Sequence, residues 1–214
     1  MTLPLSHPGS PPSLTSEILG EIASPAEAYP LLLERGRNIE VLLFSGISGI
    51  YVAFAAAERL HLADRLTLGG TVAGVLLVGF VLGLIALFLA AGILSWSSER
   101  FRGTPTQERM YAAFGYSTWP FLPLLVIIVP VQAAVYGSAL FSAARPHAPL
   151  AAVLVVRGLE LATILLWLYL MVRGVGVAAR ISGRAAAKVV ALSVLEMLVI
   201  GVLFAVITLV SFLI

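Results

Sequence analysis

The sequence contains no cysteine among its 214 residues. This absence excludes disulfide bonds, thiolate catalysis, cysteine-ligated zinc, iron–sulfur clusters and covalently attached haem. Histidine is also scarce, with 3 residues, and neither the HExxH motif of zinc proteases nor the GxSxG motif of serine hydrolases occurs. We therefore expect no enzymatic activity, no catalytic residue, no metal site and no bound cofactor.

Charged residues are few as well. They make up 11% of the chain, against 60% hydrophobic residues, and the mean hydropathy is +1.03. A soluble domain carries roughly 25% charged residues, so the excess apolar surface of this chain must face lipid. The bases are spread through short connectors, so the net charge of +2 does not indicate nucleic-acid binding. Among the 13 bases only Lys188 is a lysine, a composition typical of GC-rich prokaryotic genomes, and we expect a prokaryotic inner-membrane protein.

Two short regions precede the apolar part of the chain. Residues 1–13 are rich in proline, serine and glycine and predict a disordered tail. Residues 14–38 predict a cytoplasmic, interfacial helical segment. Apolar residues recur every fourth position from Leu14, with glutamates on the opposite face, which indicates a short amphipathic helix. Pro25 is typical of a second helix start, and Pro30 is expected to kink or divide that helix.

Residues 39–214 predict a transmembrane domain of five helices. A bilayer core about 30 Å thick needs roughly 20 helical residues. The sequence holds five apolar stretches of about that length: Val41–Ala57, about 69–95, about 118–141, about 157–179 and Val189–Ile214. We therefore predict an all-α, polytopic membrane protein with about five transmembrane helices and a short N-terminal amphipathic helix.

The fourth stretch is ambiguous because Arg157 and Glu160 interrupt it. It predicts either one long tilted helix that carries buried charges or a re-entrant segment. Five spans put nine bases on one side of the membrane and four on the other, whereas four spans nearly remove this bias. The nine are Arg35, Arg37, Arg100, Arg102, Arg109, Arg173, Arg180, Arg184 and Lys188; the four are Arg59, Arg65, Arg145 and Arg157. We therefore expect five spans, a cytoplasmic N-terminus and a C-terminus outside.

Small residues recur at four-residue spacing within the predicted spans. Such spacing lets two helix backbones approach closely in lipid. We interpret it as packing within the chain rather than a homo-oligomer face, although both readings stay open; the residues are Ser45, Gly46, Gly49, Gly70, Gly74, Gly79 and Gly83. Gly174 and Gly176 superficially match a dinucleotide-binding pattern. They lack the strand that this pattern requires and instead predict a thin helix surface.

Four charged residues fall within or beside the spans: Arg157, Glu160, Arg173 and Glu196. A charge at the centre of a span is costly, so each should have a partner. Arg157 and Glu160 are three residues apart on one helical face and should pair. Counting residues from the cytoplasmic boundary puts Arg173 and Glu196 at matching depth in neighbouring spans, and we expect a buried pair there as well.

One stretch resembles a known family. The sequence FGYSTWPFLP at residues 114–123 is similar to the Gly-Tyr-Ser…Pro signature with which the Yip1 family begins its third span, carried here by Gly115, Tyr116, Ser117 and Pro123. Residues 99–109 resemble its connector between spans two and three. Residues 180–188 resemble its connector between spans four and five. The resemblance covers about residues 15–214.

The resemblance implies a five-span protein with a cytosolic N-terminus and without catalytic residues. Eukaryotic members bind Rab GTPases, but this chain lacks their longer cytosolic region, so Rab binding is not transferred. Tyr116 and Trp119 should lie at headgroup depth at the start of the third helix, and Pro123 and Pro130 should bend that helix.

Two functions remain open. The first is a non-enzymatic scaffold or adaptor that acts through helix packing and cytoplasmic connectors, with the lipid bilayer, other membrane proteins or a second copy of the chain as partners. The alternative is a small permease or channel subunit in which Glu196, Arg157 and Glu160 line a polar route.

The absence of cysteine makes the topology directly testable. A single cysteine at Ser182 should resist a membrane-impermeant maleimide in intact cells, and one at Ala144 should react, because five spans place them on opposite sides. Both should react after the cells are permeabilised. Labelling of position 182 from outside would contradict the topology.

Overall fold

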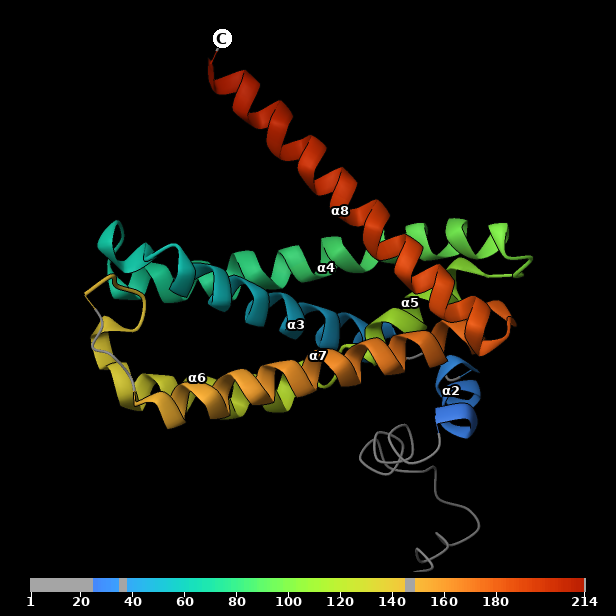
Figure 1. The fold of residues 1–214 in the computed structure, drawn as a ribbon, viewed down its shortest axis with the longest axis horizontal. Helices are drawn as coiled ribbons and strands as arrows, with labels where there is room; N and C mark the ends of the chain where they lie inside the picture. The colour runs from blue at the N-terminus through green and yellow to red at the C-terminus, as the bar shows by residue number, and fades with distance from the viewer. Residues whose placement is uncertain (1–24, 35–37, 145–148, 214) are drawn as a thin grey trace, which may run out of the picture.

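The structure is a computed structural model that describes residues 25–34, 38–144 and 149–213 (Figure 1). The predicted tail at residues 1–13 and the amphipathic helix from Leu14 lie outside this part of the chain. Every regular element in the described residues is helical. The α-helices are α2 (Pro25–Glu34), α3 (Asn38–Arg59), α4 (Leu68–Arg100), α5 (Gln107–Ser117), α6 (Phe121–Tyr136), α7 (Leu150–Ala179) and α8 (Gly183–Leu213). Two short 3₁₀ turns, η1 (Leu62–Asp64) and η2 (Gly137–Ala139), lie in the connectors.

Four segments of the described chain are long and apolar enough to cross a membrane: Ile39–Arg59, Leu68–Arg100, Gln107–Ala139 and Leu150–Ala179. The 31 residues of α8 form the helix that the sequence predicts as the fifth span. Large apolar side chains point outward along these helices. Leu77 on α4 is 71% exposed and Leu154 on α7 is 63% exposed. Exposing so much apolar surface to water is unfavourable. The chain is therefore an all-helical, multi-pass membrane protein.

Helices α3 and α4 contact each other backbone to backbone. A Cβ atom at Gly83 would overlap the Ser45 carbonyl oxygen, and one at Gly49 would overlap the Gly79 carbonyl oxygen. These small residues pack within the chain, as predicted, because only glycine permits this approach. Gly74 differs, because a Cβ there would meet nothing within 4 Å. The prediction of intramolecular packing is therefore wrong for Gly74.

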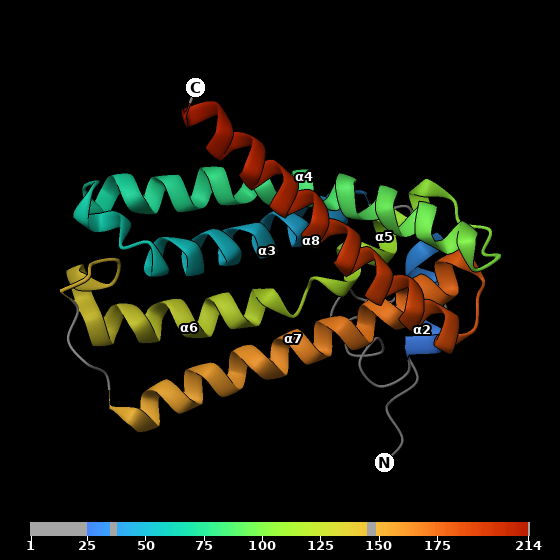
Figure 2. The same cartoon turned by 45° about the horizontal axis from the view of Figure 1, so that its top comes forward.

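The largest apolar core lies at one end of the bundle, which we call the packed end. It joins α2 and α5 to the first turns of α3 and α8 and to the last turns of α4 and α7 (Figures 1 and 2). Its fully buried side chains include Tyr29, Leu94, Met110 and Val175. At the other end of the bundle, which we call the far end, α3 and α6 finish and α7 begins. The core there is a smaller cluster around Phe54 and Phe141.

Helix α2 starts where the sequence predicts, but it is not divided at Pro30. It begins at Pro25, as predicted, but it continues through Pro30 to Glu34 as one helix. Tyr29 and Leu32, on either side of the proline, are 0% and 2% exposed in the core. Packing of this kind stabilises helices more than local propensity does, which accounts for a continuous helix around Pro30. The ring of Tyr29 lies where a Cβ at Gly174 would stand, so the predicted thin surface of α7 receives α2.

The third span is broken at residues 118–120, upstream of Pro123 and Pro130, and the bends predicted at those two prolines stay predictions. Helix α5 ends at Ser117, the chain turns at 118–120, and α6 starts at Phe121 (Figure 2). Pro120 is the residue before α6, and Pro123 lies in its first turn, where a missing N–H does little harm. Pro130 lies inside α6, which continues past it to Tyr136.

The fourth span is one continuous helix of 30 residues, α7, and not a re-entrant segment. It begins at Leu150, seven residues before the predicted start at Arg157. At 1.5 Å per residue it is about 45 Å long, which exceeds a bilayer core of about 30 Å and places its first turns at the membrane boundary. Arg157 therefore lies near that boundary rather than at the centre of the span.

The connectors at the far end are tied together by Asp64. Its carboxylate accepts a hydrogen bond from the Ser142 hydroxyl at 2.5 Å and another from the Ala143 backbone N–H at 3.0 Å. These donors lower the pKa of Asp64. The Ala63 backbone N–H also donates to the Phe141 carbonyl oxygen at 3.0 Å. The α3–α4 connector is thus fixed to the chain that follows α6.

The glycine contacts predict a contrast between two substitutions in α4. Gly83→Ala should destabilise the protein by about 1–3 kcal/mol, because the new methyl group forces α3 and α4 apart. Gly74→Ala faces open space and should leave stability unchanged or raise it, since alanine favours the helix. Thermal unfolding of both variants in the same detergent measures the difference. Equal midpoints would show that the close packing is unimportant.

Candidate functional site

The predicted pair on α7 is present. Arg157 Nη1 donates to Glu160 Oε2 at 2.6 Å, three residues along the helix. The Tyr51 hydroxyl of α3 donates to Glu160 Oε1 at 2.9 Å. Both oxygens of this carboxylate are therefore engaged, and the glutamate joins α7 to α3. The sequence analysis missed Tyr51, whose polar atom in an apolar helix is the signal that could have marked it.

Glu196 has different partners from those predicted. Its Oε1 accepts from Arg100 Nη1 at 3.0 Å, and its Oε2 accepts from the Ser97 hydroxyl at 2.7 Å. Both partners lie in the last turn of α4. The guanidinium of Arg100 also lies 3.7 Å from the ring centroid of Trp96. Glu196 thus links α8 to α4 at the packed end.

The predicted pair between Arg173 and Glu196 is therefore wrong. Arg173 is exposed, and its guanidinium lies 5.9 Å from the ring centroid of Tyr169, one turn earlier on α7. The depth estimate took α8 to run alongside α7. Instead α8 crosses toward α4, and its C-terminal part stands away from the other helices in both views (Figures 1 and 2).

The residues that resemble the Yip1 signature lie at the break between α5 and α6 in the third span. A Cβ at Gly115 would overlap the side chain of Val41, so α5 packs directly on α3. Ser117 Oγ donates to the Phe114 carbonyl oxygen at 2.7 Å, and Thr118 Oγ1 donates to the Gly115 carbonyl oxygen at 2.7 Å. These side chains bond to carbonyl groups of the last turn of α5, where the Gly115 oxygen also accepts from the Thr118 backbone N–H at 3.1 Å.

Tyr116 is 1% exposed within the packed end, so its ring contacts protein and not lipid headgroups. Its hydroxyl donates to Glu40 Oε2, in the first turn of α3, at 3.2 Å, and its depth in the membrane stays a prediction. Its ring also packs against Phe44, with the centroids 6.3 Å apart. The sequence correctly indicated a boundary between helices, but this boundary is covered by α3 and not by lipid.

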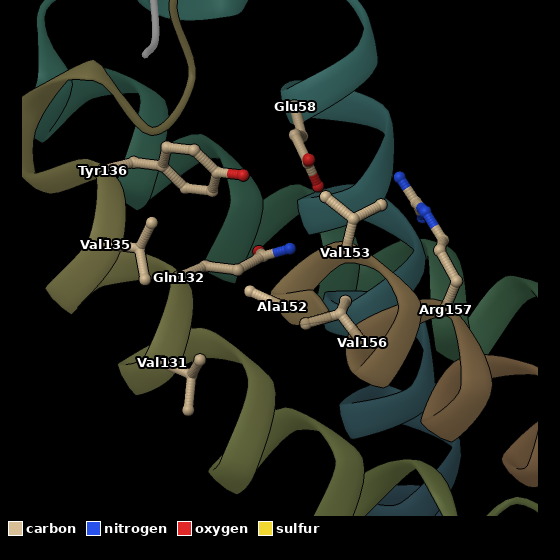
Figure 3. A pocket seen from close by; sticks show the side chains of 9 residues that line it. All are labelled: Glu58, Val131, Gln132, Val135, Tyr136, Ala152, Val153, Val156 and Arg157. Atoms are coloured by element: carbon tan, nitrogen blue, oxygen red, sulfur yellow. The ribbon is translucent and has the colours of Figure 1, made fainter. Parts of the chain in front are cut away.

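A second polar group of residues lies at the far end, between the end of α3, the end of α6 and the start of α7. Glu58, Gln132, Tyr136 and Arg157 line a small cavity of about 70 Å³ together with valines (Figure 3). Glu58 is 7% exposed and Gln132 is 5% exposed. Glu58, Gln132 and Tyr136 were not among the predicted site residues. Gln132 could have been found as the amide inside an otherwise apolar stretch.

The three charges of the permease alternative do not line one route. Glu196 lies beside the last turn of α4 at the packed end. Arg157 and Glu160 lie in the first half of α7, toward the far end, and neutralise each other. In the described part of the chain, no three histidine, aspartate or glutamate residues gather as a metal site.

Comparison with known proteins gives one match. A family model described as the Yip1 domain matches residues 20–210, nearly the whole chain. No curated protein sequence and no solved structure matched the chain.

The observed Glu196 partners can be tested by a double-mutant cycle. Arg100→Gln and Glu196→Gln should show a coupling energy of roughly 0.5–1 kcal/mol, because the arginine is 43% exposed and solvent weakens the pair. Arg173→Gln combined with Glu196→Gln should be additive. Unfolding free energies in detergent measure both cycles. Coupling to Arg173 and none to Arg100 would contradict the structure.

Proposed function

Because the chain belongs to the Yip1 family and is a multi-pass membrane protein, we propose that it acts as a non-enzymatic membrane scaffold or adaptor. The observation that carries this proposal is the construction of the packed end. Helix α2 and α5, the first part of the third span, join α3, α4, α7 and α8 there in one apolar core. Adaptors need a preformed surface, and this core supplies one.

The connectors at the packed end are held against each other. The Thr104 backbone N–H donates to the Ala179 carbonyl oxygen at 3.0 Å, which fixes the α4–α5 connector to the end of α7. A Cβ at Gly103 would lie 3.2 Å from the Ala179 side chain, so the contact is tight. The Glu196–Arg100 ion pair adds α8 to the same surface. Both connectors are therefore presented in one arrangement.

The charge of this surface indicates the chemistry of its partner. Four bases are exposed around the two connectors, at Arg102, Arg180, Arg184 and Lys188. Among the side chains that the structure describes, the exposed acids beside these connectors are two, Glu99 and Glu108. Opposite charge favours both encounter and specificity, so the proposed partner is another membrane protein with an acidic cytoplasmic segment. Rab binding is not part of this proposal.

The proposal includes an orientation. The excess of bases at the packed end supports an orientation with that end and the N-terminus in the cytoplasm and the C-terminus outside. The arginine-rich composition supports the inner membrane of a prokaryote. The bilayer itself covers the exposed apolar faces of α4 and α7.

Site-specific photo-crosslinking in living cells tests the adaptor role. A photoreactive residue at Arg102 or at Arg184 should capture the same protein, since both positions belong to one surface. The double charge reversal Arg102→Glu with Arg184→Glu should reduce capture, probed from Thr104, by roughly tenfold or more, from loss of two charge contacts. Arg59→Glu, at the far end, is the matched control and should leave capture unchanged.

Two results would contradict the adaptor role. One is the absence of a shared partner at positions 102 and 184. The other is an equal loss of capture in the Arg59→Glu control, which would indicate a general effect of charge or expression.

A further inference from the structure

Near the end of α7, Arg173 has no carboxylate partner in the part of the chain that the structure describes. Glu196, its predicted partner, binds Arg100 instead. The guanidinium of Arg173 lies 5.9 Å from the ring centroid of Tyr169. The face of a ring attracts the positive charge but offers no lone pair, so the N–H donors of the guanidinium remain available to an acceptor. Arg173 is therefore free to bind an anionic group.

Arg173 also lines a small cavity where α7 ends and α8 begins, at the right-hand corner of Figure 1. The cavity volume is about 150 Å³, and a water molecule needs about 10–15 Å³ of such space, so a phosphate group fits. The lining combines one cation with three branched apolar side chains and two glycines, and it contains no acid: Val172, Arg173, Gly176, Val177, Ile181 and Gly183. A ligand with an anionic group joined to an apolar part matches this lining.

The charge beside the cavity has the same sign as Arg173. Arg180 directly precedes Ile181, Arg184 directly follows Gly183, and both bases are exposed. Bases at a membrane surface attract anionic lipids and repel cationic groups. A ligand whose headgroup carries a net negative charge is therefore favoured over a zwitterionic one.

The length of α7 indicates the depth of the cavity. This helix has 30 residues and is about 45 Å long, which is about the thickness of a bilayer with its headgroup layers. We therefore expect its last turns, and the cavity beside them, at the level of the headgroups. A phospholipid supplies an anionic group joined to an apolar part at this level.

We propose that Arg173 and this cavity bind the phosphate group of an anionic phospholipid, of the phosphatidylglycerol type. The guanidinium donates to the phosphate oxygens, a pairing in which both charge and geometry match. Val172 and Val177 contact the apolar part of the lipid next to its headgroup. Phosphatidylethanolamine also has a phosphate, but its ammonium group adds a positive charge among the bases. The proposal does not depend on the adaptor role.

Native mass spectrometry of the purified full chain tests the proposal, with phosphatidylglycerol and phosphatidylethanolamine of identical acyl chains in competition. The wild-type protein should retain the glycerol lipid in preference. Arg173→Gln should lower this preference roughly fivefold, which is the contribution of one base near a membrane surface. Arg102→Gln removes an exposed base from the other connector at the same end and is the control. It should leave the preference unchanged.

A second pair of variants tests the cavity without removing Arg173. A Cβ at Gly183 would meet nothing within 4 Å, and an acid in the first turn of a helix is stabilising, so Gly183→Asp should fold. Its carboxylate faces the same cavity as Arg173 and should repel the phosphate, so the preference should fall at least as far as in Arg173→Gln. Gly183→Asn adds a side chain of the same size without the charge and should keep the preference.

Three results would overturn the lipid site. The first is equal retention of the two lipids by the wild-type protein, and the second is an undiminished preference in Arg173→Gln. The third is an equal loss in Arg102→Gln, which would indicate general surface charge and no particular site. Inorganic phosphate at millimolar concentration should not displace the lipid, because it has no apolar part. Displacement by phosphate would overturn the assignment to a lipid.

Discussion

The backbone contact between α3 and α4 is the constraint on which the rest of the bundle depends. In lipid, apolar side chains gain little by leaving one apolar neighbour for another, so close van der Waals packing must hold helices together. Gly49, Gly79 and Gly83 allow that packing over the middle of both helices. Once α3 and α4 are fixed, the last turns of α4 extend past the start of α3. Ser97 and Arg100 are thereby placed where α8 can meet them.

The two ends of the bundle differ in their packing. The packed end buries large side chains from six helices, including Tyr29 of α2 and Met110 of α5. At the far end the Asp64 carboxylate joins two connectors by hydrogen bonds. A polar cavity lies beside Gln132. The middle faces lipid. The packed end is therefore the surface on which the proposed adaptor role depends, and the far end holds a small polar cavity.

Much of this architecture could be predicted from the sequence, because hydropathy indicates the spans and local spacing indicates contacts along one helix. The first two and last spans follow from apolar length, and the Arg157–Glu160 pair follows from three-residue spacing on one helix. The Arg173–Glu196 prediction failed because depth along a helix says nothing of its direction in the membrane plane. Helix α8 turns toward α4, and Ser97 and Arg100 engage Glu196 instead.

Other features depend on tertiary packing that no local pattern records. The aromatic ring of Tyr116 suits contact with lipid headgroups or with protein, and only the position of α3 shows that it contacts protein. Pro30 usually ends or bends a helix, but the burial of Tyr29 holds α2 together. Glu58 and Gln132 are far apart in the sequence, so their common cavity could be seen only in the fold.

The central claim is that the packed end presents its two connectors in one fixed arrangement. Pulsed electron paramagnetic resonance with spin labels at Arg102 and Arg184 measures this directly, and the cysteine-free chain allows both labels to be placed without other changes. The account predicts a single narrow distance distribution for the protein in lipid nanodiscs. A broad or multimodal distribution would contradict it, because the two connectors would then move independently.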